Sequence, residues 1–500
     1  MDDNGGEVSA AKKLKHDEAS TLNFLKTETQ SWSGSNGLVL VAADRSDGSW
    51  QHAPVAITPA TIQRKLFQEA IALASPFNKL IDRVARDTSY LKETLADSAK
   101  GDEFTKRLLE LLDLHGGDKA RQQLYLGIHR SDYMVDDKTK RLLQVELNTI
   151  SSSFACLSAR VTRLHQHLLC LHPQTQAAVS QLDKRFAEAP SLKDLPKNDA
   201  DKEIPKALVK AHRLYDQRRK DKKNGRTLYI LFVIQEAERN YVDQRHIEYE
   251  ITQSSGVPCL RRTLAEIAQT GTVDADNGAL LIEGGLEISV AYFRAGYTPT
   301  DYPTEVQWSG RSLIESSLAI KCPSIAYHLV GAKKVQQRLA DPGVLERFVS
   351  DKAECAKIRA CFAGLWSLGS DLDPTVKAKA MENPGNFVIK PQREGGGNNI
   401  YGENVKTALQ TMSAEELGAH ILMERIFPAR EEAYLMRHAE IHRGPALSEL
   451  GIYSTFVGDG NKSYLDKVAG HLLRTKFDGV DEGGVATGFA SLNSPYLVDN

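Results

Sequence analysis

The chain contains the glycine-rich segment Lys390-Pro391-Gln392-Arg393-Glu394-Gly395-Gly396-Gly397-Asn398-Asn399, directly after the apolar, strand-like run Phe387-Val388-Ile389. Three consecutive glycines can adopt positive φ and let peptide N–H groups approach a ligand closely. Lys390 and Arg393 add positive charge, and Glu394 offers the kind of hard oxygen ligand that Mg²⁺ prefers. A flexible surface loop is the alternative, but the neighbouring acid, bases and amides favour a loop that binds the phosphates of ATP.

The composition is typical of a soluble globular enzyme, with 41% apolar and 26% charged residues. The length of 500 residues is enough for about two to four domains. Lys and Arg (63) nearly balance Asp and Glu (65), so the molecule as a whole does not attract nucleic acid or an anionic membrane. The six cysteines form no C-x-x-C pair and no zinc-ligand spacing, which indicates a reducing compartment.

The beginning of the chain carries no recognisable export signal. Residues 1–20 are polar and lack an apolar core of signal-peptide length, and no later run reaches the length of a membrane-spanning helix. These observations predict a cytoplasmic protein. For residues 1–20, a tail that has no role is the favoured interpretation.

Apolar periodicity predicts a mixed α/β structure from the first hundred residues onward. The pattern favours strands at 38–43, 54–57, 124–128, 142–147, 422–426 and 448–456, and helices at 61–73, 78–96 and 104–114. Glu146 and Asn148 alternate near the end of one of these strands, so both side chains are expected on one face.

A basic segment at residues 206–226 marks a predicted domain boundary, because it ends in the turn signal Asn224-Gly225. A nucleic-acid patch is one interpretation of this segment, but the interspersed Asp216 and Asp221 favour a solvated helix and linker. Alternating elements follow: a strand at 227–234, a helix at 246–254, a strand at 259–262, a helix at 264–269 capped by Thr263, and a hairpin at 280–293. This alternation predicts a compact lobe with a parallel sheet.

Several long peptides occur in an order that resembles eukaryotic glutathione synthetase. They are QVELNTISSSF (residues 144–154), ERNYVDQR (238–245), FRAGY (293–297), GAKKVQQ (331–337), KPQREGGGNNIYG (390–402), SELGIY (448–453) and GHLLRTK (470–476). The resemblance covers nearly the whole chain. It implies an α/β (α+β) ATP-grasp fold, with an inserted smaller α/β lobe that binds substrate.

The resemblance also implies a division of the chain into three parts. Residues 1–226 form the N-terminal part of the ATP-grasp body, with metal and dipeptide residues. Residues 227–330 form the inserted lobe. Residues 331–500 form the nucleotide-binding part, with the glycine-rich loop and a C-terminal lid.

For the nucleotide, the resemblance implies a Mg²⁺ set of Glu146, Asn148 and Glu394. Oxygen donors of this kind suit Mg²⁺, although Glu146 and Asn148 alone are also compatible with capping the next turn. The implied ATP contacts are Glu146, Lys333, Lys390, Pro391, Gln392, Arg393, Glu394, Gly395, Gly396, Gly397, Asn398, Asn399, Tyr401, Met423, Glu424, Arg425, Ile426, Glu449, Lys476 and Glu482. Without the resemblance, Lys333 would be interpreted as an ordinary solvated lysine. Met423 and Ile426 are equally compatible with positions in the apolar core.

The implied second substrate is γ-glutamylcysteine, whose two carboxylates suit arginine forks. The residues that match the family's dipeptide and acceptor positions are Arg130, Ser151, Ser152, Ser153, Glu238, Arg239, Asn240, Gln244, Arg294, Ala295, Gly296, Tyr297, Arg474, Val485 and Ala486. Arg474 is expected to bind either the reacting carboxylate of the dipeptide or the carboxylate of the incoming glycine. The implied catalytic set is Arg474, Lys390 and Glu394.

The glycine-rich segment at residues 481–488 has the composition of a mobile lid, and a surface loop is the alternative. Ala486 suits glycine as the acceptor amine. Thr487 departs from the Ala-Ala pair common in glutathione-forming members, and this departure bears on which acceptor amine the protein selects. Ala295 stands where some members carry an acid, which matters little if only the backbone is used.

The predicted activity is an ATP-dependent carbon–nitrogen ligation that joins γ-glutamylcysteine to glycine through an acyl phosphate. No motif for a Ser, Cys or His nucleophile is present in the sequence. The alternatives are a homologue that uses another acceptor amine, as in homoglutathione synthesis, and a silent nucleotide-binding homologue. The expected partners are these substrates with Mg²⁺, no nucleic acid and no membrane, and the family suggests a homodimer.

Overall fold

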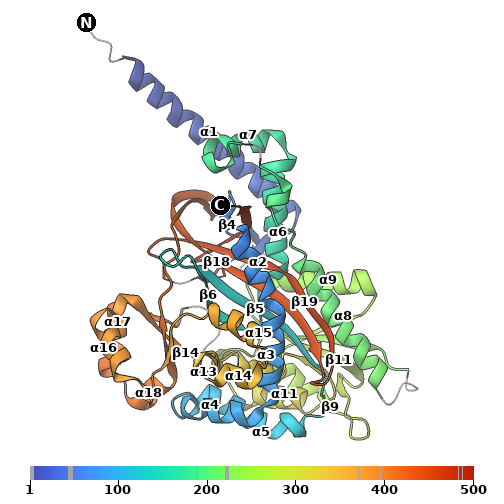
Figure 1. Ribbon diagram of the computed structural model, residues 1–500. Coiled ribbons are helices and arrows are strands. Elements are labelled where there is room, and N and C mark those ends of the chain that lie inside the picture. The colour runs from blue at the N-terminus through green and yellow to red at the C-terminus, as the bar shows by residue number, and fades with distance from the viewer. Residues whose placement is uncertain are drawn as a thin grey trace.

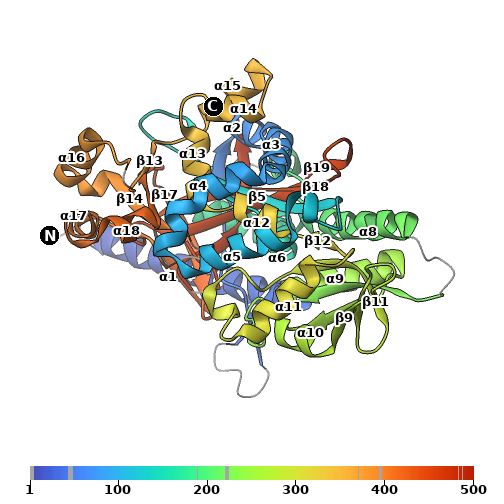
Figure 2. The ribbon, with the colours of Figure 1, turned by 90° about the horizontal axis from the view of Figure 1, so that it is seen from below.

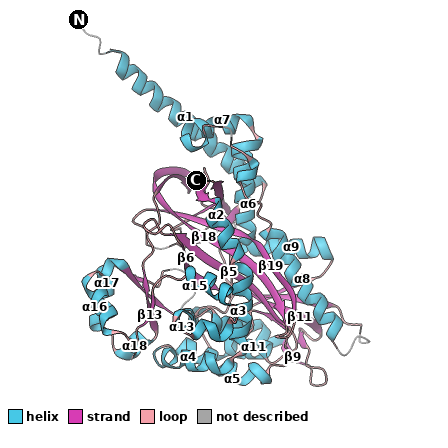
Figure 3. Cartoon of the chain, in the orientation of Figure 1, coloured by secondary structure: helices cyan, strands magenta, loops and turns pink. Residues whose placement is uncertain are grey.

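The computed structural model describes residues 5–42, 49–188, 190–219, 225–369, 371–392, 397–481, 483–486 and 488–499 (Figure 1). Its centre is a seven-stranded sheet, which Figure 3 shows in magenta among the surrounding helices. The strand order is β17 (Glu431–Arg437), β3 (Val55–Ala56), β20 (Ser491–Asn493), β19 (Ser463–Phe477), β18 (Glu440–Gly458), β5 (Tyr125–Val135) and β6 (Leu142–Asn148). All neighbours are antiparallel except β20 and β3, and β17 also pairs with β18, so the sheet closes on itself at one end.

Helices cover both faces of this sheet (Figures 1 and 2). One face packs against α2 (Arg64–Ala72), α3 (Ala74–Arg86), α4 (Thr88–Gly101), α5 (Glu103–His115) and α12–α15 (Ile325–Val330, Lys333–Ala340, Val344–Phe348, Lys352–Ala360). The other packs against α1 (Gly5–Ser35), α6 (Ala155–Gln166), α7 (Pro173–Leu182), α8 (Ala200–Arg218) and α9 (Tyr241–Ser255). Leu473 and Leu472 alternate between the two cores, as the two-residue period of a strand requires.

One predicted helix is in fact two. The periodicity favoured a single helix over residues 78–96, but α3 ends at Arg86 and α4 begins at Thr88. Asp87 lies between them, and its carboxylate accepts a hydrogen bond from the Tyr90 N–H at 2.9 Å. An Asp that caps the next helix competes with the continuing helical hydrogen bonds, so the apolar period continues across a break in the backbone.

A second sheet of six strands lies in residues 228–322. Its order is β8 (Cys259–Arg262), β7 (Leu228–Val233), β11 (Leu286–Phe293), β10 (Leu280–Ile282) and β9 (Gly271–Val273), with β12 (Ile320–Cys322) also paired to β11. The pairs among β8, β7, β11 and β12 are parallel, as expected. Helices α10 (Leu264–Thr270) and α11 (Glu305–Glu315) flank the sheet, and Thr263 caps α10 in a full capping box. The β10–β11 hairpin turns through Gly284 and Gly285, which have φ of 74° and 149°.

The strands before and after the glycine-rich segment belong to a third, antiparallel sheet, drawn in orange in Figure 1. Its order is β13 (Leu365–Ser367), β16 (His420–Glu424), β14 (Phe387–Pro391) and β15 (Ile400–Tyr401). Helices α16 (Pro374–Glu382), α17 (Glu403–Thr411) and α18 (Ala414–Gly418) lie beside it. Two short pairs complete the fold: β1 (Val39–Val41) with β2 (Trp50–His52), and β4 (Ala60–Gln63) with β21 (Pro495–Val498). Among the helices of the described ranges, none is long and apolar enough to traverse a bilayer.

Three buried histidines lie in the cores, and no charged partner contacts them among the residues that the structure describes. Burial lowers the pKa of His129 and His471 to about 3, and it lowers that of His165 to about 4, although the Ala56 carbonyl opposes that change. All three are therefore neutral in the folded protein at every pH at which an exposed histidine becomes protonated.

We expect the free energy of unfolding to fall as the pH drops from about 6.5 to about 4. In this pH range the three histidines bind protons in the unfolded chain but not in the folded chain. Each of them therefore contributes about 1.4 kcal/mol per pH unit to the slope of the free energy of unfolding. Chemical denaturation across this range measures the slope. In the variant His165→Gln, this slope should be smaller by the contribution of about one proton. An unchanged slope would contradict the assignment of His165 as a buried neutral group.

Candidate active site

Four neighbouring strands of the central sheet bring the predicted catalytic residues together. The β5–β6 register sets Arg130 opposite Asn148 and Asp132 opposite Glu146. The β18–β19 register sets Glu449 opposite Arg474, and Gly451 of β18 lies beside Asp132. Cross-strand partners have Cβ atoms about 5 Å apart, so these charged side chains must interact.

Three carboxylates form the acidic part of this cluster. One oxygen from each of Asp132, Glu146 and Glu449 lies within 4.8 Å of the others, an arrangement that could hold a cation. The donors are hard oxygens, which suit Mg²⁺. Asn148 turns its amide nitrogen toward the Arg130 carbonyl (3.3 Å), Asp132 Oδ2 (3.1 Å) and Glu146 Oε1 (3.3 Å), so the amide oxygen is the atom left to ligate a metal.

Four cations surround the carboxylates. Arg130 pairs with Asp132 through two bonds of 2.7 and 2.8 Å. Arg474 reaches Asp132 at 3.2 Å and also pairs with Glu449. Lys333, at the start of α13, lies 3.4 Å from Glu146, and the Lys390 ammonium donates to the neighbouring Val145 carbonyl at 2.9 Å. The structure thus joins Lys333, Lys390 and Glu146, which are far apart in the sequence.

Burial and charge act against each other in this cluster. Burial alone would raise the pKa of Glu146, but Lys333, Lys390, Arg474 and Arg130 hold it below its ordinary value. Burial raises the pKa of Asp132 to about 6, although Arg130 and Arg474 oppose the change. Burial also lowers the pKa of Lys390, an effect that Glu146 opposes.

The glycine-rich loop leaves β14 next to Lys390. Gln392, which is buried, accepts a hydrogen bond from the Lys334 N–H at 2.9 Å, so the start of the loop is tied to α13. Pro391 ends β14, Gly397 and Asn398 are exposed, and Asn399 donates to the Tyr401 hydroxyl at 3.1 Å. The predicted residues Arg393, Glu394, Gly395 and Gly396 lie outside the described residues.

The predicted adenine segment lies at the end of β16. Met423 packs with Val388 and Ala363 in a small apolar cluster that Ile426 borders. The Glu424 and Arg425 N–H groups donate to the carbonyls of Gly364 and Asn386, both at 2.8 Å. These two N–H groups therefore already donate within the protein. The expected backbone contacts with the adenine base must come from other N–H and carbonyl groups of residues 423–426.

A turn at residues 151–154 carries the predicted dipeptide serines. Ser151 and Phe154 have positive φ, 50° and 69°. Arg294, only 1% exposed, donates to the Ser152 carbonyl at 3.1 Å and to Ser153 Oγ at 2.7 Å. Arg130 donates to the Ser153 carbonyl at 3.4 Å, so the turn joins the carboxylate cluster to Arg294.

Further dipeptide residues lie in the segments that follow β7 and β11 of the second sheet, and Gln244 lies on α9. Glu238 accepts from the Asn240 N–H at 2.6 Å and from Gln244 at 3.3 Å. Tyr297 accepts from Gln235 at 3.4 Å. Ala295 is buried and Gly296 has a φ of 91°.

Gly483 of the lid segment lies beside the acidic cluster. A Cβ placed on Gly483 would lie 3.6 Å from Glu449 Oε2. Arg239 donates to the Ala486 carbonyl at 2.6 Å, Val485 is buried, and Lys476 donates to the Asp481 carbonyl at 2.5 Å. Glu482 and Thr487 lie outside the described residues.

Comparisons with known proteins agree with this geometry. The family model described as eukaryotic glutathione synthase, ATP binding domain, matches residues 19–497. The chain belongs to the eukaryotic glutathione synthase family.

Individual relatives cover most of the chain. Glutathione synthetase of Dictyostelium discoideum is 41% identical over 95% of this chain and 99% of its own, and that of Homo sapiens is 38% identical over 89% and 90%. A chloroplastic glutathione synthetase of Solanum lycopersicum is 45% identical over 89% and 78%. The predicted ATP-dependent ligase activity, glutathione synthesis, is confirmed at the level of the family.

A solved structure supports the fold. It is a glutathione synthetase-like effector from Globodera pallida, with a TM-score of 0.73 and 23% identity over 95% of this chain and 96% of that one. This likeness confirms the predicted ATP-grasp type of fold.

Sequence reasoning missed Asp132, although it lies two residues after the predicted Arg130. The side chain is 1% exposed and contacts three predicted site residues. The available signal was the i, i+2 spacing of Arg130 and Asp132 in a strand, which places both on the face that carries Glu146 and Asn148.

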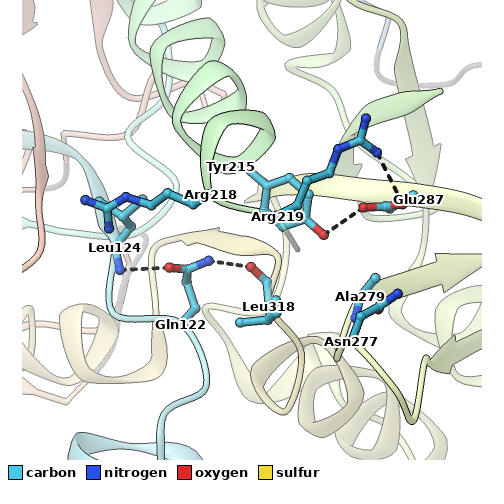
Figure 4. A pocket seen from close by; sticks show the side chains of 9 residues that line it. All are labelled: Gln122, Leu124, Tyr215, Arg218, Arg219, Asn277, Ala279, Glu287 and Leu318. Atoms are coloured by element: carbon cyan, nitrogen blue, oxygen red, sulfur yellow. Dashed lines mark hydrogen bonds and ion pairs between the residues drawn. The ribbon is translucent and has the colours of Figure 1, made fainter. Parts of the chain in front are cut away.

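A small cavity of about 100 Å³ lies away from this cluster, between the end of α8 and the second sheet (Figure 4). In it, Glu287 accepts from the Tyr215 hydroxyl at 3.1 Å and lies 3.6 Å from Arg219. None of the sequence-predicted site residues lines it.

Asp243 holds the turn that carries the predicted serines. It is fully buried on α9, and it accepts from the N–H groups of Phe154 (2.9 Å), Cys156 (2.8 Å) and Leu157 (3.1 Å) at the start of α6. A carboxylate at a helix N-terminus also interacts favourably with the helix dipole.

We expect Asp243→Ala to destabilise the protein by about 2 to 4 kcal/mol, because it leaves several buried N–H donors without an acceptor. Denaturant unfolding followed by circular dichroism measures the change. Asp373→Ala is the matched control, since Asp373 caps α16 from an exposed position and should matter much less. Equal effects of the two substitutions would contradict the anchoring role of Asp243.

Proposed function

We propose that this protein is a glutathione synthetase that joins the cysteinyl carboxylate of γ-glutamylcysteine to glycine with ATP. The single observation that carries the proposal is the convergence of Lys333, Lys390 and Glu146 with Arg130 and Arg474 on one face of the central sheet. Phosphoryl transfer to a carboxylate needs cations for the phosphates and for the acceptor in one place.

In the first step, a carboxylate oxygen of the dipeptide attacks the γ-phosphorus of ATP, the bond to the bridging oxygen breaks, and ADP leaves. Lys333 and Lys390 would bind the phosphates. Glu146 and Asn148, with Glu394 from the glycine-rich loop, would hold Mg²⁺, which neutralises charge on the phosphates when it is bound.

In the second step, the glycine ammonium group first gives one proton to solvent, and its nitrogen attacks the carbonyl carbon of the acyl phosphate. Phosphate then leaves, and the nitrogen gives up a second proton, so the amide keeps one. Arg474 would stabilise the negative charge that develops on the carbonyl oxygen. Residues 481–488, the lid, would limit access of water, since free water would hydrolyse the acyl phosphate.

The dipeptide would lie between the turn at residues 151–154 and the second sheet. Arg294 and Arg130 would meet its carboxylates, and Glu238 its ammonium group. We also propose a cytoplasmic location and, on the basis of the family likeness, a homodimer. We keep the three-part division 1–226, 227–330 and 331–500 as a proposal. The second sheet supports the middle part, whereas the central sheet combines strands of the first and third parts.

The test is product formation from γ-glutamylcysteine and ATP with glycine, alanine, β-alanine or serine offered in turn, with products identified by mass. Glutathione as the main product supports the proposal. A different main product supports another acceptor amine, and ATP binding without dipeptide-dependent release of ADP indicates a silent nucleotide-binding homologue.

We expect Lys390→Ala and Arg294→Ala to act on different substrates. Loss of one charge-assisted bond costs about 1.5 to 3 kcal/mol, or roughly 10- to 100-fold in affinity. Lys390→Ala should raise the KM for ATP, and Arg294→Ala should raise that for γ-glutamylcysteine. If both variants shift only the ATP constant, the second sheet does not contribute to the dipeptide site.

We expect Ala486→Leu to reduce the use of glycine relative to β-alanine. Ala486 is partly buried against the core, so a larger side chain would reshape the acceptor end, and one methylene group is worth about 1 to 3 kcal/mol of discrimination. Competition between the two amines, with ATP binding as the control, measures the effect. An unchanged product ratio means that Ala486 does not line the acceptor pocket.

A further inference from the structure

Asp132 is the most highly connected side chain of the cluster. Its Oδ1 accepts from Arg130 Nε at 2.7 Å. Its Oδ2 accepts from Arg130 Nη2 at 2.8 Å, from Asn148 Nδ2 at 3.1 Å and from Arg474 Nη2 at 3.2 Å. Four hydrogen bonds from three residues therefore end on this one carboxylate, three of them on Oδ2.

These bonds separate Asp132 from the other two carboxylates. Three of them converge on Oδ2, Oδ1 accepts from Arg130 and packs against Gly451, and the side chain is 1% exposed. Glu146 and Glu449 each face fewer donors among the described residues. Asp132 is thus placed to hold other side chains rather than to contact the reacting atoms.

The two arginines need a shared anion. Arg130 and Arg474 carry like charges within reach of one carboxylate oxygen, in a site where water is scarce and repulsion is strong. Arg474 also has Glu449, but within the described part of the chain Asp132 is the one carboxylate that pairs with Arg130. Without Asp132, Arg130 would be a buried, unpaired cation that could turn away.

The neighbouring strand leaves room for this arrangement. Gly451 of β18 lies directly beside Asp132, and a Cβ at this position would lie 2.6 Å from Asp132 Oδ1 and 2.9 Å from Arg130 Cδ. Real side chains do not tolerate such distances, so a glycine here permits the close packing of the ion pair. The packing of β18 therefore depends on the same residue pair.

We propose that Asp132 is a positioning residue that holds Arg130, Arg474 and the amide of Asn148 as one unit against the carboxylate of the dipeptide that is activated. This inference rests on the proposed function. It assigns to Asp132 no contact with substrate or metal, and it predicts that Asp132 acts through the arginines.

The test is steady-state kinetics of Asp132→Asn, which keeps the shape but removes the charge. Mutation of a residue that positions other site residues typically lowers activity by about 10- to 100-fold. We expect kcat/KM for γ-glutamylcysteine to fall by that factor, while the KM for ATP changes by less than about threefold. A loss confined to the ATP constant, or no loss, would overturn the proposal.

Asp201→Asn is the matched control. Asp201 is another buried carboxylate with a bidentate arginine, Arg163, at 2.8 and 3.0 Å, and it bonds no predicted site residue. It should leave the kinetics unchanged. Equal losses in the two variants would mean that Asp132 serves only the fold.

Two further measurements keep the proposal testable if Asp132→Asn folds poorly. Gly451→Ala retains every charge but displaces the Arg130–Asp132 pair, and it should reproduce the loss for the dipeptide. In a protein that already carries Arg130→Ala, Asp132→Asn should lower kcat/KM for γ-glutamylcysteine by at most a third of the factor seen in the wild-type background. Full additivity of the two substitutions, or normal dipeptide kinetics in Gly451→Ala, would refute an action through Arg130.

The wild-type reaction separates this inference from the proposed function. If the wild-type protein makes no glutathione, the proposed function fails. The positioning role is then judged by dipeptide binding in calorimetric titrations of the wild-type protein and Asp132→Asn, where equal affinities would overturn it.

Discussion

The register of four antiparallel strands is the constraint on which the active site depends. Strands β6, β5, β18 and β19 each contribute charged residues, and every one of them reaches its partner through a cross-strand or next-strand contact. A slip by one residue in any of these strands would turn its charges to the opposite face, into a core of leucine and isoleucine. The apolar cores on both faces therefore specify the register, and the register specifies the site.

The cluster itself contributes little to stability. Burying ions costs several kcal/mol each, and mutual attraction offsets that cost only where geometry is good. Asp132 keeps a raised pKa in spite of two arginines, which shows that burial outweighs the attraction at this position. Glu146 shows the opposite balance, because four cations outweigh its burial. The surrounding fold, with its two large cores, stabilises an arrangement that would separate on its own.

Local patterns predicted much of the fold, and long-range pairing explains the rest. The alternation of Glu146 and Asn148, the Thr263 cap and the β10–β11 hairpin depend on neighbouring residues and were predicted from them. The break at Asp87 was missed because the apolar period continues across it. The approach of Lys333 to Glu146, and the four contacts of Asp132, arise from tertiary structure that no window of sequence contains. The family likeness supplied the roles of Lys333 and Arg474, which periodicity could not.

Strand order also bears on how the protein is made. Strand β20 (Ser491–Asn493) lies between β19 and β3 in the central sheet, and β21 (Pro495–Val498) pairs with β4 (Ala60–Gln63). On the ribosome, β3 and β4 emerge long before their partners β20 and β21. The early strands must wait with unpaired edges, and exposed edges of this kind favour aggregation. Closure of the sheet therefore waits until residues 491–498 have left the ribosome, and until then the nascent chain is a natural client for chaperones.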